Sequence, residues 1–283
     1  MADDLAIGLV TGLTDDTAAR LRDLKNLGIT TIQLVYPPES AASGDQAPMR
    51  AVTDAVKETG VEITTVVCTF PGERYDDIAA VRETVGFVPA ATRAERLEMT
   101  RAFGGVAKQL GVGRLSCHIG YIPEDAADPV RKDLVDAVRT LCADLAKDGL
   151  TFALETGQET AAGLKAFLEG VDAPNLKVNF DPANMILYGT QQPLPALETL
   201  YPWVDGVHFK DGAWPEDDGQ LGRETALGEG RVGIPEFTAN LFLLGYRGPL
   251  TIEREVGGEQ QKRDIIKAVT LIQDLVGRYG PRH

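Results

Sequence analysis

The chain has 283 residues, of which 43% are hydrophobic and 25% charged, which is enough to form one large core. A formal net charge of −14 and a pI of about 4.7 argue against nucleic acid as a partner, because acidic surfaces repel phosphodiester backbones. Membrane and secreted classes are not expected either: no apolar run approaches the roughly 18 residues of a membrane span, and the opening MADDLAIGLV is unlike a signal peptide. The three cysteines form no CxxC motif, which fits a reducing cytoplasm.

Short strand-like runs alternate with amphipathic helical segments along the whole chain. The predicted strands span residues 5–10, 31–36, 62–70, 114–120, 150–157, 176–181, 204–210 and 249–253. The predicted helices span residues 15–28, 49–60, 93–111, 129–149, 160–171, 194–200, 234–245 and 260–279. Open sheets seldom reach eight evenly spaced strand–helix units, so the sequence predicts an α/β fold, a (β/α)8 TIM barrel that forms a single domain over residues 1–283.

Two connections are long for a compact barrel: residues 71–92 after the third predicted strand and residues 211–233 after the seventh. Both follow the carboxyl ends of strands, where the catalytic face of such a barrel lies. Because loops of this length are usually lids or binding loops, we predict both to be active-site loops.

The segment LKVNFDPANMILYG, residues 176–189, carries a carboxylate at the end of a buried strand. Leu176, Val178 and Phe180 alternate with polar residues, and Asp181 ends the strand directly before Pro182. A buried carboxylate is costly unless it is paired or binds a metal. Taken alone, Asp181 fits a helix N-cap as well as a metal ligand.

Strand parity groups Asp181 with three other residues. Bulky residues should point outward to the helices, which leaves Glu155, Asp181, His208 and Glu253 pointing into the barrel near the ends of four consecutive strands. Three carboxylates and one imidazole that converge would repel one another without a cation. The predicted site therefore binds one divalent metal ion; the oxygen-rich donor set favours Mn²⁺ or Mg²⁺, with Co²⁺ and Zn²⁺ as alternatives.

The strand ends also resemble a known family, the xylose-isomerase-like TIM-barrel superfamily, or sugar phosphate isomerase/epimerase group. The segments that carry the resemblance are LSCHIG, FALETG, NFDPAN, VHFKD, LGEG and GPLTIERE. The resemblance implies that Glu155, Asp181, His208 and Glu253 bind one metal ion, often Mn²⁺, and that Glu155 and Glu253 are also the catalytic acid/base pair. It further suggests homodimers or homotetramers.

Geometry independently supports this double role. The fifth and eighth predicted strands, which carry Glu155 and Glu253, lie on either side of the sixth and seventh, which carry Asp181 and His208. The two glutamates should approach a chelated sugar, or a polyol-derived ketone, from opposite sides. One takes the proton α to the carbonyl, and the other returns a proton to the enediolate. The predicted activity is thus that of a metal-dependent sugar, or sugar phosphate, isomerase or epimerase in the cytoplasm.

The chain departs from the ketose 3-epimerases of this family at two positions. Those enzymes have a His three residues after the metal Asp and an Arg six residues after the metal His, where this chain has Asn184 and Trp214. Asn184 could still bind a hydroxyl group, and Trp214 could either cover a sugar face or pack within its loop.

Other residues are predicted to contact the substrate. His118 should face the barrel mouth from the end of the fourth strand, and Lys210 could bind an oxygen anion or pair with Asp211. Glu229 could bind a hydroxyl group or support a turn. Gln33 and Glu159 are weaker candidates.

Three other functions compete with the isomerase. A lyase or dehydratase acting on a keto-sugar or inosose could use the same site, because α-proton abstraction also initiates β-elimination. An apurinic-type endonuclease would need a histidine-rich trinuclear zinc site, but the chain has only three histidines, and Asn184 replaces a zinc-binding His. A non-catalytic sugar-binding barrel would not require the Glu155 and Glu253 pair.

Overall fold

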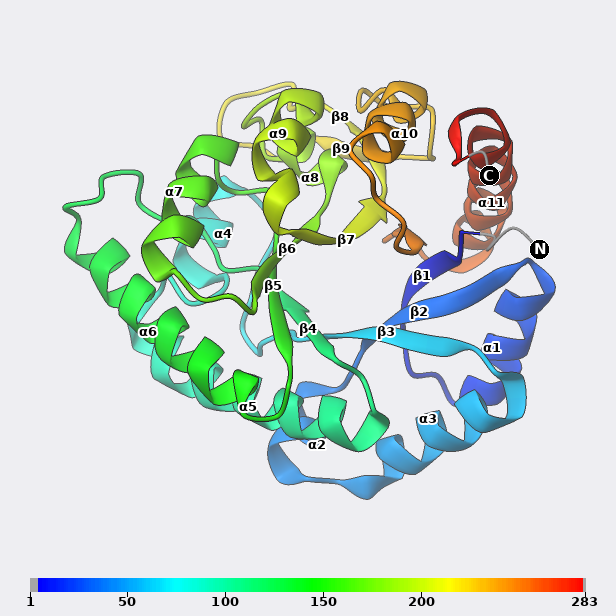
Figure 1. Ribbon diagram of the computed structural model, residues 1–283, viewed down its shortest axis with the longest axis horizontal. Helices are drawn as coiled ribbons and strands as arrows, with labels where there is room; N and C mark the ends of the chain where they lie inside the picture. The colour runs from blue at the N-terminus through cyan, green and yellow to red at the C-terminus, as the bar shows by residue number, and fades with distance from the viewer. Residues whose placement is uncertain (1–4, 282–283) are drawn as a thin grey trace.

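The computed structural model describes residues 5–281 of the chain. Within this range, parallel strands close into a barrel in the order β1-β10-β7-β6-β5-β4-β3-β2, and helices surround it (Figure 1). The barrel strands are β1 (Ile7–Gly12), β2 (Ile29–Val35), β3 (Glu62–Val67), β4 (Arg114–Cys117), β5 (Thr151–Glu155), β6 (Leu176–Phe180), β7 (Val204–Phe209) and β10 (Leu250–Ile252). This closed eight-stranded barrel confirms the predicted (β/α)8 fold.

The helices that follow the strands pack around the barrel. They are α1 (Thr17–Asn26), α3 (Gln46–Thr59), α5 (Ala90–Leu110), α6 (Pro129–Ala146), α7 (Ala161–Val171), α9 (Pro193–Leu200), α10 (Ile234–Leu243) and α11 (Gly258–Tyr279). Short polar side chains begin several of them: Asp16 accepts the N–H of Ala19 at 2.8 Å, and Thr160 accepts the N–H of Gly163 at 3.1 Å. Among residues 5–281, no helix is long and apolar enough to cross a membrane.

Several short elements interrupt the long connections. They are α2 (Pro38–Ser43), α4 (Ile78–Thr84), α8 (Pro182–Leu187), the 3₁₀ turn η1 (Tyr201–Trp203), and the antiparallel pair β8 (Asp211–Ala213) and β9 (Arg223–Thr225). The predicted loop 71–92 thus contains α4, and the predicted loop 211–233 contains the β8–β9 pair. Hydrophobic periodicity in the sequence does not reveal these elements, because none is longer than seven residues and a periodic pattern needs a longer window.

One carboxylate organises each long connection: the half-buried Glu73 in the first and the buried Asp211 in the second. Glu73 accepts the backbone N–H groups of Phe70 at 3.2 Å and Gly86 at 2.8 Å. Asp211 accepts four backbone N–H groups at 2.9–3.1 Å, from Gly212, Gly228, Gly230 and Val232. A Cβ at Gly230 would lie 2.1 Å from Oδ1 of Asp211, so only glycine fits there. Each carboxylate compensates loop N–H groups that burial would otherwise leave unpaired.

The barrel wall separates an apolar outer layer from a polar inner layer. On the outside, Phe180 and Phe209 pack against Phe237 of α10, with ring centroids 6.0 and 5.7 Å apart. Each such phenylalanine contributes roughly 1.5–3 kcal/mol on burial. On the inside, the side chains of Gln33 and Asn179 meet across the barrel, 3.3 Å apart. The predicted strand parity is therefore the observed one on these strands.

Candidate metal centre

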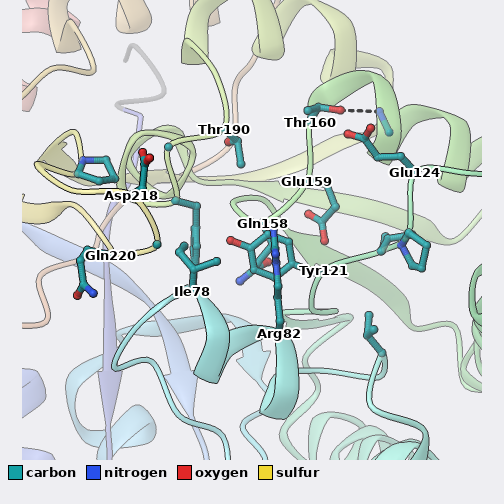
Figure 2. A pocket seen from close by; sticks show the side chains of 18 of the residues that line it. Ile78, Arg82, Tyr121, Glu124, Gln158, Glu159, Thr160, Thr190, Asp218 and Gln220 are labelled. Atoms are coloured by element: carbon teal, nitrogen blue, oxygen red, sulfur yellow. Dashed lines mark hydrogen bonds between the residues drawn. The ribbon is translucent and has the colours of Figure 1, made fainter.

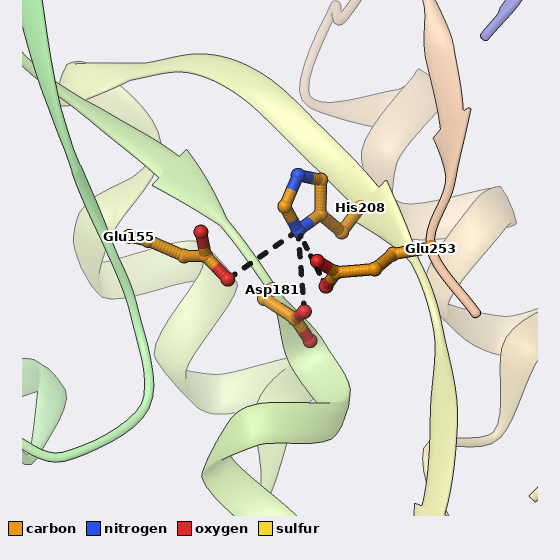
Figure 3. A group of neighbouring side chains, drawn as sticks. All are labelled: Glu155, Asp181, His208 and Glu253. Atoms are coloured by element: carbon orange, nitrogen blue, oxygen red, sulfur yellow. Dashed lines mark hydrogen bonds and ion pairs between the residues drawn. The ribbon is translucent and has the colours of Figure 1, made fainter. Parts of the chain in front are cut away.

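The structure brings together the four residues predicted to bind a metal (Figure 3). Glu155 ends β5, Asp181 and Glu253 directly follow β6 and β10, and His208 lies near the end of β7. Each offers one ligand atom, and these atoms lie within 4.8 Å of one another. From Nδ1 of His208, the carboxylate oxygens lie at 3.1 Å for Glu253, 3.3 Å for Asp181 and 3.5 Å for Glu155.

The opposite side of the His208 ring is held by two inward-facing amides. Nε2 lies 3.0 Å from Oε1 of Gln33 and 2.9 Å from the amide nitrogen of Asn179. With a metal bound, Nε2 would donate its proton to Gln33 and Nδ1 would keep its lone pair for the metal; without a metal, the three carboxylates favour a proton on Nδ1 as well. A Cβ at Gly206 would lie 2.4 Å from Oδ1 of Asn179, so the glycine of β7 makes room for this amide.

The two roles that the sequence leaves open for Asp181 fall on different oxygens. Oδ1 accepts the N–H groups of Ala183 at 2.8 Å and Asn184 at 3.0 Å, which makes Asp181 the N-cap of α8. Oδ2 faces Nδ1 of His208. Capping thus orients the carboxylate and leaves its second oxygen directed at the cluster.

The electrostatics of the cluster depend on cations. Burial alone would lower the pKa of His208, but the carboxylates of Glu253 and Glu155 hold that pKa well above its usual value. Burial alone would raise the pKa of Glu253, but the ammonium group of Lys210 and the His208 ring hold it well below its usual value. Burial raises the pKa of Asp181. A buried acidic cluster of this kind needs positive charge nearby.

The donor set fits a divalent cation. Oxygen ligands from three carboxylates with one imidazole nitrogen suit Mn²⁺ or Mg²⁺, and the imidazole also suits Co²⁺ or Zn²⁺. The four residues that would hold it are Glu155, Asp181, His208 and Glu253, and Gln33 would orient the imidazole.

A cavity of about 620 Å³, a size typical of small-molecule sites, opens onto this cluster and contains both glutamates. His118 and Asn184 also line it. Nε2 of His118 lies 3.4 Å from Oε1 of Glu155, and the Asn184 amide donates to the same oxygen at 3.0 Å. Both predicted substrate contacts therefore lie next to one of the proposed catalytic residues.

The structure does not bring the other three predicted substrate contacts into this cavity. Lys210 is buried and does not line the cavity, and it donates to Glu253 at 3.1 Å and to Asn184 at 3.3 Å. Trp214 packs against the hydrophobic core beside its loop. Glu229 is on the surface, with its side chain 63% exposed and 3.7 Å from Lys267. Within the LGEG segment, the backbone N–H groups of Gly228 and Gly230 donate to Asp211.

Sequence reasoning did not single out several residues that complete the site. Asn179 contacts His208 and lies two residues before Asp181 on the same strand. Its parity with Asp181 therefore indicates in the sequence that its side chain points into the barrel. Tyr75 and Tyr188 line the cavity, and the Tyr75 ring lies 5.9 Å from that of His118. Glu255 and Glu224 also line it. No periodic pattern distinguishes these four from other loop residues.

Comparison with known proteins agrees with this architecture. The family model described as xylose isomerase-like TIM barrel matches residues 21–275. A xylose isomerase domain protein from Planctomyces limnophilus is 36% identical, with a TM-score of 0.89, and the alignment covers 96% of this chain and 98% of that one. A short match, 30% identical over 99 residues, links the chain to the uncharacterized protein YihM of Escherichia coli K12 and covers 34% of this chain but only 30% of that protein.

More distant structures share the fold alone. A D-tagatose 3-epimerase-like protein is 18% identical with a TM-score of 0.73, covering 97% of this chain and 98% of that one. The probable 3-DHS dehydratase AsbF from Bacillus anthracis is 17% identical with a TM-score of 0.71, covering 95% and 98%. The family model spans most of the sequence, and this chain therefore belongs to the xylose isomerase-like TIM barrel family.

Proposed function

We propose that this protein is a divalent-metal-dependent sugar isomerase or epimerase that transfers a proton α to a carbonyl group through an enediolate. The observation that carries the proposal is the cluster of Glu155, Asp181, His208 and Glu253 at the carboxyl ends of their strands, with both glutamates lining one cavity. The family membership and the epimerase-like structural neighbours agree with it.

The pKa of each glutamate lies below its usual value despite burial, but partly different cations cause this: Lys210 and His208 for Glu253, and His118 and His208 for Glu155. Lys210 lies 3.1 Å from Glu253 and favours its ionised form, so Glu253 is assigned as the base that takes the α-proton. Glu155 receives a hydrogen bond from Asn184 and lies 3.4 Å from His118. His118 can supply the proton that Glu155 returns to the opposite side of the enediolate.

A divalent cation, when bound, would polarise the substrate carbonyl and stabilise the negative charge of the enediolate. Two amide side chains, Asn184 and Gln33, orient the catalytic and ligand residues. Asn184 bridges Glu155 and Lys210, and Gln33 holds the His208 ring. Mn²⁺ is the proposed metal, since the donor set is rich in oxygen.

The charge of the cavity favours an unphosphorylated substrate. Six carboxylates line it, from Glu73, Asp76, Glu155, Glu224, Glu253 and Glu255, and among the described lining residues there is no lysine or arginine. A phosphate group would meet repulsion from several of these carboxylates, whereas sugar hydroxyl groups can donate hydrogen bonds to them.

Metal-dependent deuterium exchange tests the proposal. Protein stripped with a chelator and reloaded with Mn²⁺ is incubated in D₂O with ketoses, aldoses, inososes and their phosphates, and mass spectrometry reads deuterium uptake and loss of water. We expect an unphosphorylated sugar to take up deuterium without losing water, and to take up none after the metal is removed by the chelator. Loss of water would instead assign the site to a dehydratase, and absence of exchange with every sugar would overturn the proposed function.

A further inference from the structure

A second cavity, of about 820 Å³, adjoins the one at the metal centre. The two share Tyr188 and Gln220 as a common wall. Gln158 also connects them: it lines the second cavity, and its amide nitrogen lies 3.2 Å from Nδ1 of His118 in the first. One layer of side chains therefore separates the two cavities.

Two polar side chains that line the second cavity, Glu159 and Gln158, have oxygen atoms without well-formed hydrogen bonds in the described chain. Glu159 is only 7% exposed, and among residues 5–281 no hydrogen bond of good geometry reaches either of its carboxylate oxygens; the backbone N–H groups of Ile122 and of Glu159 itself approach the carboxylate and only partly offset its burial. The amide oxygen of Gln158, which is 3% exposed, is likewise unpaired within the described chain. Figure 2 shows Glu159 directed into the space between α4 and the chain around Thr160. Buried polar atoms without partners are uncommon and costly, so these three oxygens indicate a site built for a ligand.

The walls indicate which chemistry this ligand has. Arg82 of α4 lies over the Tyr121 ring, 4.7 Å from its centroid, and Tyr188 meets the same ring edge-on at 6.2 Å. The cavity thus offers aromatic surface beside hydrogen-bonding groups, the combination that suits a ring bearing hydroxyl groups.

The charge balance excludes an anionic ligand. Carboxylates from Glu124, Glu159, Asp217 and Asp218 line the cavity against the single guanidinium of Arg82. Burial raises the pKa of Glu159 to about 8, so near neutral pH its carboxyl group can both donate and accept a hydrogen bond. That capacity matches a hydroxyl group better than a phosphate or a carboxylate.

We propose that this second cavity is a subsite for a further sugar ring, and that the substrate is a glycoside or disaccharide whose reacting ketose unit lies at the metal centre. This inference rests on the proposed function, because the ring in the first cavity is the one that reacts. Glu159 and Gln158 bind hydroxyl groups of the second ring, and the link between the rings passes over the wall of Tyr188 and Gln220.

Isothermal titration calorimetry on the Mn²⁺-loaded protein tests this assignment. The probes are the ketose disaccharides turanose, maltulose, lactulose and isomaltulose, which differ in linkage or in the second ring, with D-fructose as the one-ring reference. We expect at least one disaccharide to bind about tenfold or more tightly than D-fructose. In Glu159→Ala that affinity should fall to within about twofold of the value for D-fructose on the unmodified protein.

The matched control is Glu169→Ala, which removes an exposed glutamate of α7 outside both cavities. It should keep the full preference for the disaccharide. Removal of an unpaired buried carboxylate should not unfold the protein, and Glu159→Gln, which retains the shape and hydrogen-bonding groups, should keep more of the preference than Glu159→Ala. A preference that survives in Glu159→Ala would overturn the subsite, as would binding no tighter than that of D-fructose for all four disaccharides.

Deuterium exchange on the same samples separates this inference from the proposed function. Exchange with single sugars but no disaccharide preference would leave the isomerase standing and reject the subsite. A Glu159-dependent preference without exchange would support the subsite and reject the proposed chemistry.

Discussion

The ammonium group of Lys210 lies 3.1 Å from Oε2 of Glu253, and both side chains are largely removed from water. Lys210 also lies 4.0 Å from Oδ2 of Asp181 and donates to Asn184. The sequence suggests a substrate contact for Lys210, but in the structure it serves as a buried counter-charge of the acidic cluster. It also pairs with Glu255, 2.5 Å away, so it supplies positive charge to two carboxylates that line the cavity.

Lys210→Met should therefore destabilise the chelator-treated protein more than the metal-loaded protein. Loss of one partner of a buried ion pair costs about 3–5 kcal/mol, which lowers the melting temperature of a chain of this size by roughly 5–10 °C. Added Mn²⁺ should restore more stability to the variant than to the unmodified protein. Differential scanning calorimetry with and without Mn²⁺ measures this, and an equal response to metal in both proteins would contradict the role of counter-charge. Lys262→Met, at an exposed position of α11, is the control.

Glu155→Gln and Glu253→Gln should each lower kcat by a factor of about 10² or more, the scale of a general acid or base. Each should also weaken Mn²⁺ binding, because a neutral amide is a poorer ligand than a carboxylate. Steady-state exchange rates and metal titration measure the two effects. Near-normal turnover in either variant would reject the acid/base assignment, and Glu198→Gln on the outer helix α9 should behave like the unmodified protein.

Gln33→Leu should weaken metal binding although it leaves all four candidate metal-binding residues unchanged. Oε1 of Gln33 lies 3.0 Å from Nε2 of His208, and loss of such an orienting partner typically lowers metal affinity by about 10–100-fold. Competition with a fluorescent chelator gives the affinity. Unchanged affinity would mean that Asn179 alone orients the ring, and Gln46→Leu on the exposed side of α3 controls for the substitution itself.

Glu159→Gln should change how stability depends on pH. The pKa of Glu159 is about 8 in the folded protein, above the value near 4.5 of an exposed glutamate. The unfolded chain therefore releases this proton at lower pH than the folded protein, so the contribution of Glu159 to stability falls as pH rises from about 4.5 to 8. Glutamine does not ionise, so the variant should gain stability relative to the unmodified protein over this range, by at most about 5 kcal/mol.

Urea denaturation at pH 5, 7 and 9 measures that difference. We expect nearly equal stabilities at pH 5 and a more stable variant at pH 9. Parallel pH profiles for the two proteins would show that Glu159 is ionised in the folded state. Glu169→Gln should leave the profile unchanged.

Asp211→Ala should loosen the connection of residues 211–233, since four backbone N–H groups would lose their acceptor. The expected result is faster limited proteolysis within this segment and a lower rate of deuterium exchange into substrate, because Gln220, Leu221 and Gly222 line the cavity at the candidate metal centre. Glu216→Ala changes an exposed carboxylate of the same segment and should leave both rates unaltered. Equal resistance of the two variants to proteolysis would show that other contacts hold the segment in place.

The sequence by itself determined the barrel and the direction of its polar side chains. Apolar and polar residues alternate with a period of two along each strand, so burial of Phe152, Val178 or Phe209 on the outside directs Glu155, Asp181 and His208 inward. The carboxyl ends of the strands meet at one face of the barrel, and this alone predicts that the four candidate ligands lie together. The positions of the two long connections were predictable for the same reason.

Only the tertiary structure decided where the loop and strand-end side chains point. Loops have no period, so Trp214 and Glu229 could not be assigned to the cavity or to the surface from their spacing, and Asp211 could not be recognised as the acceptor of four N–H groups. Lys210 follows its strand with inward parity, yet its ammonium group pairs with Glu253 and Glu255 and does not line the cavity. The unpaired state of Glu159 depends on every neighbour within hydrogen-bonding distance, and those neighbours come from segments that only folding brings together.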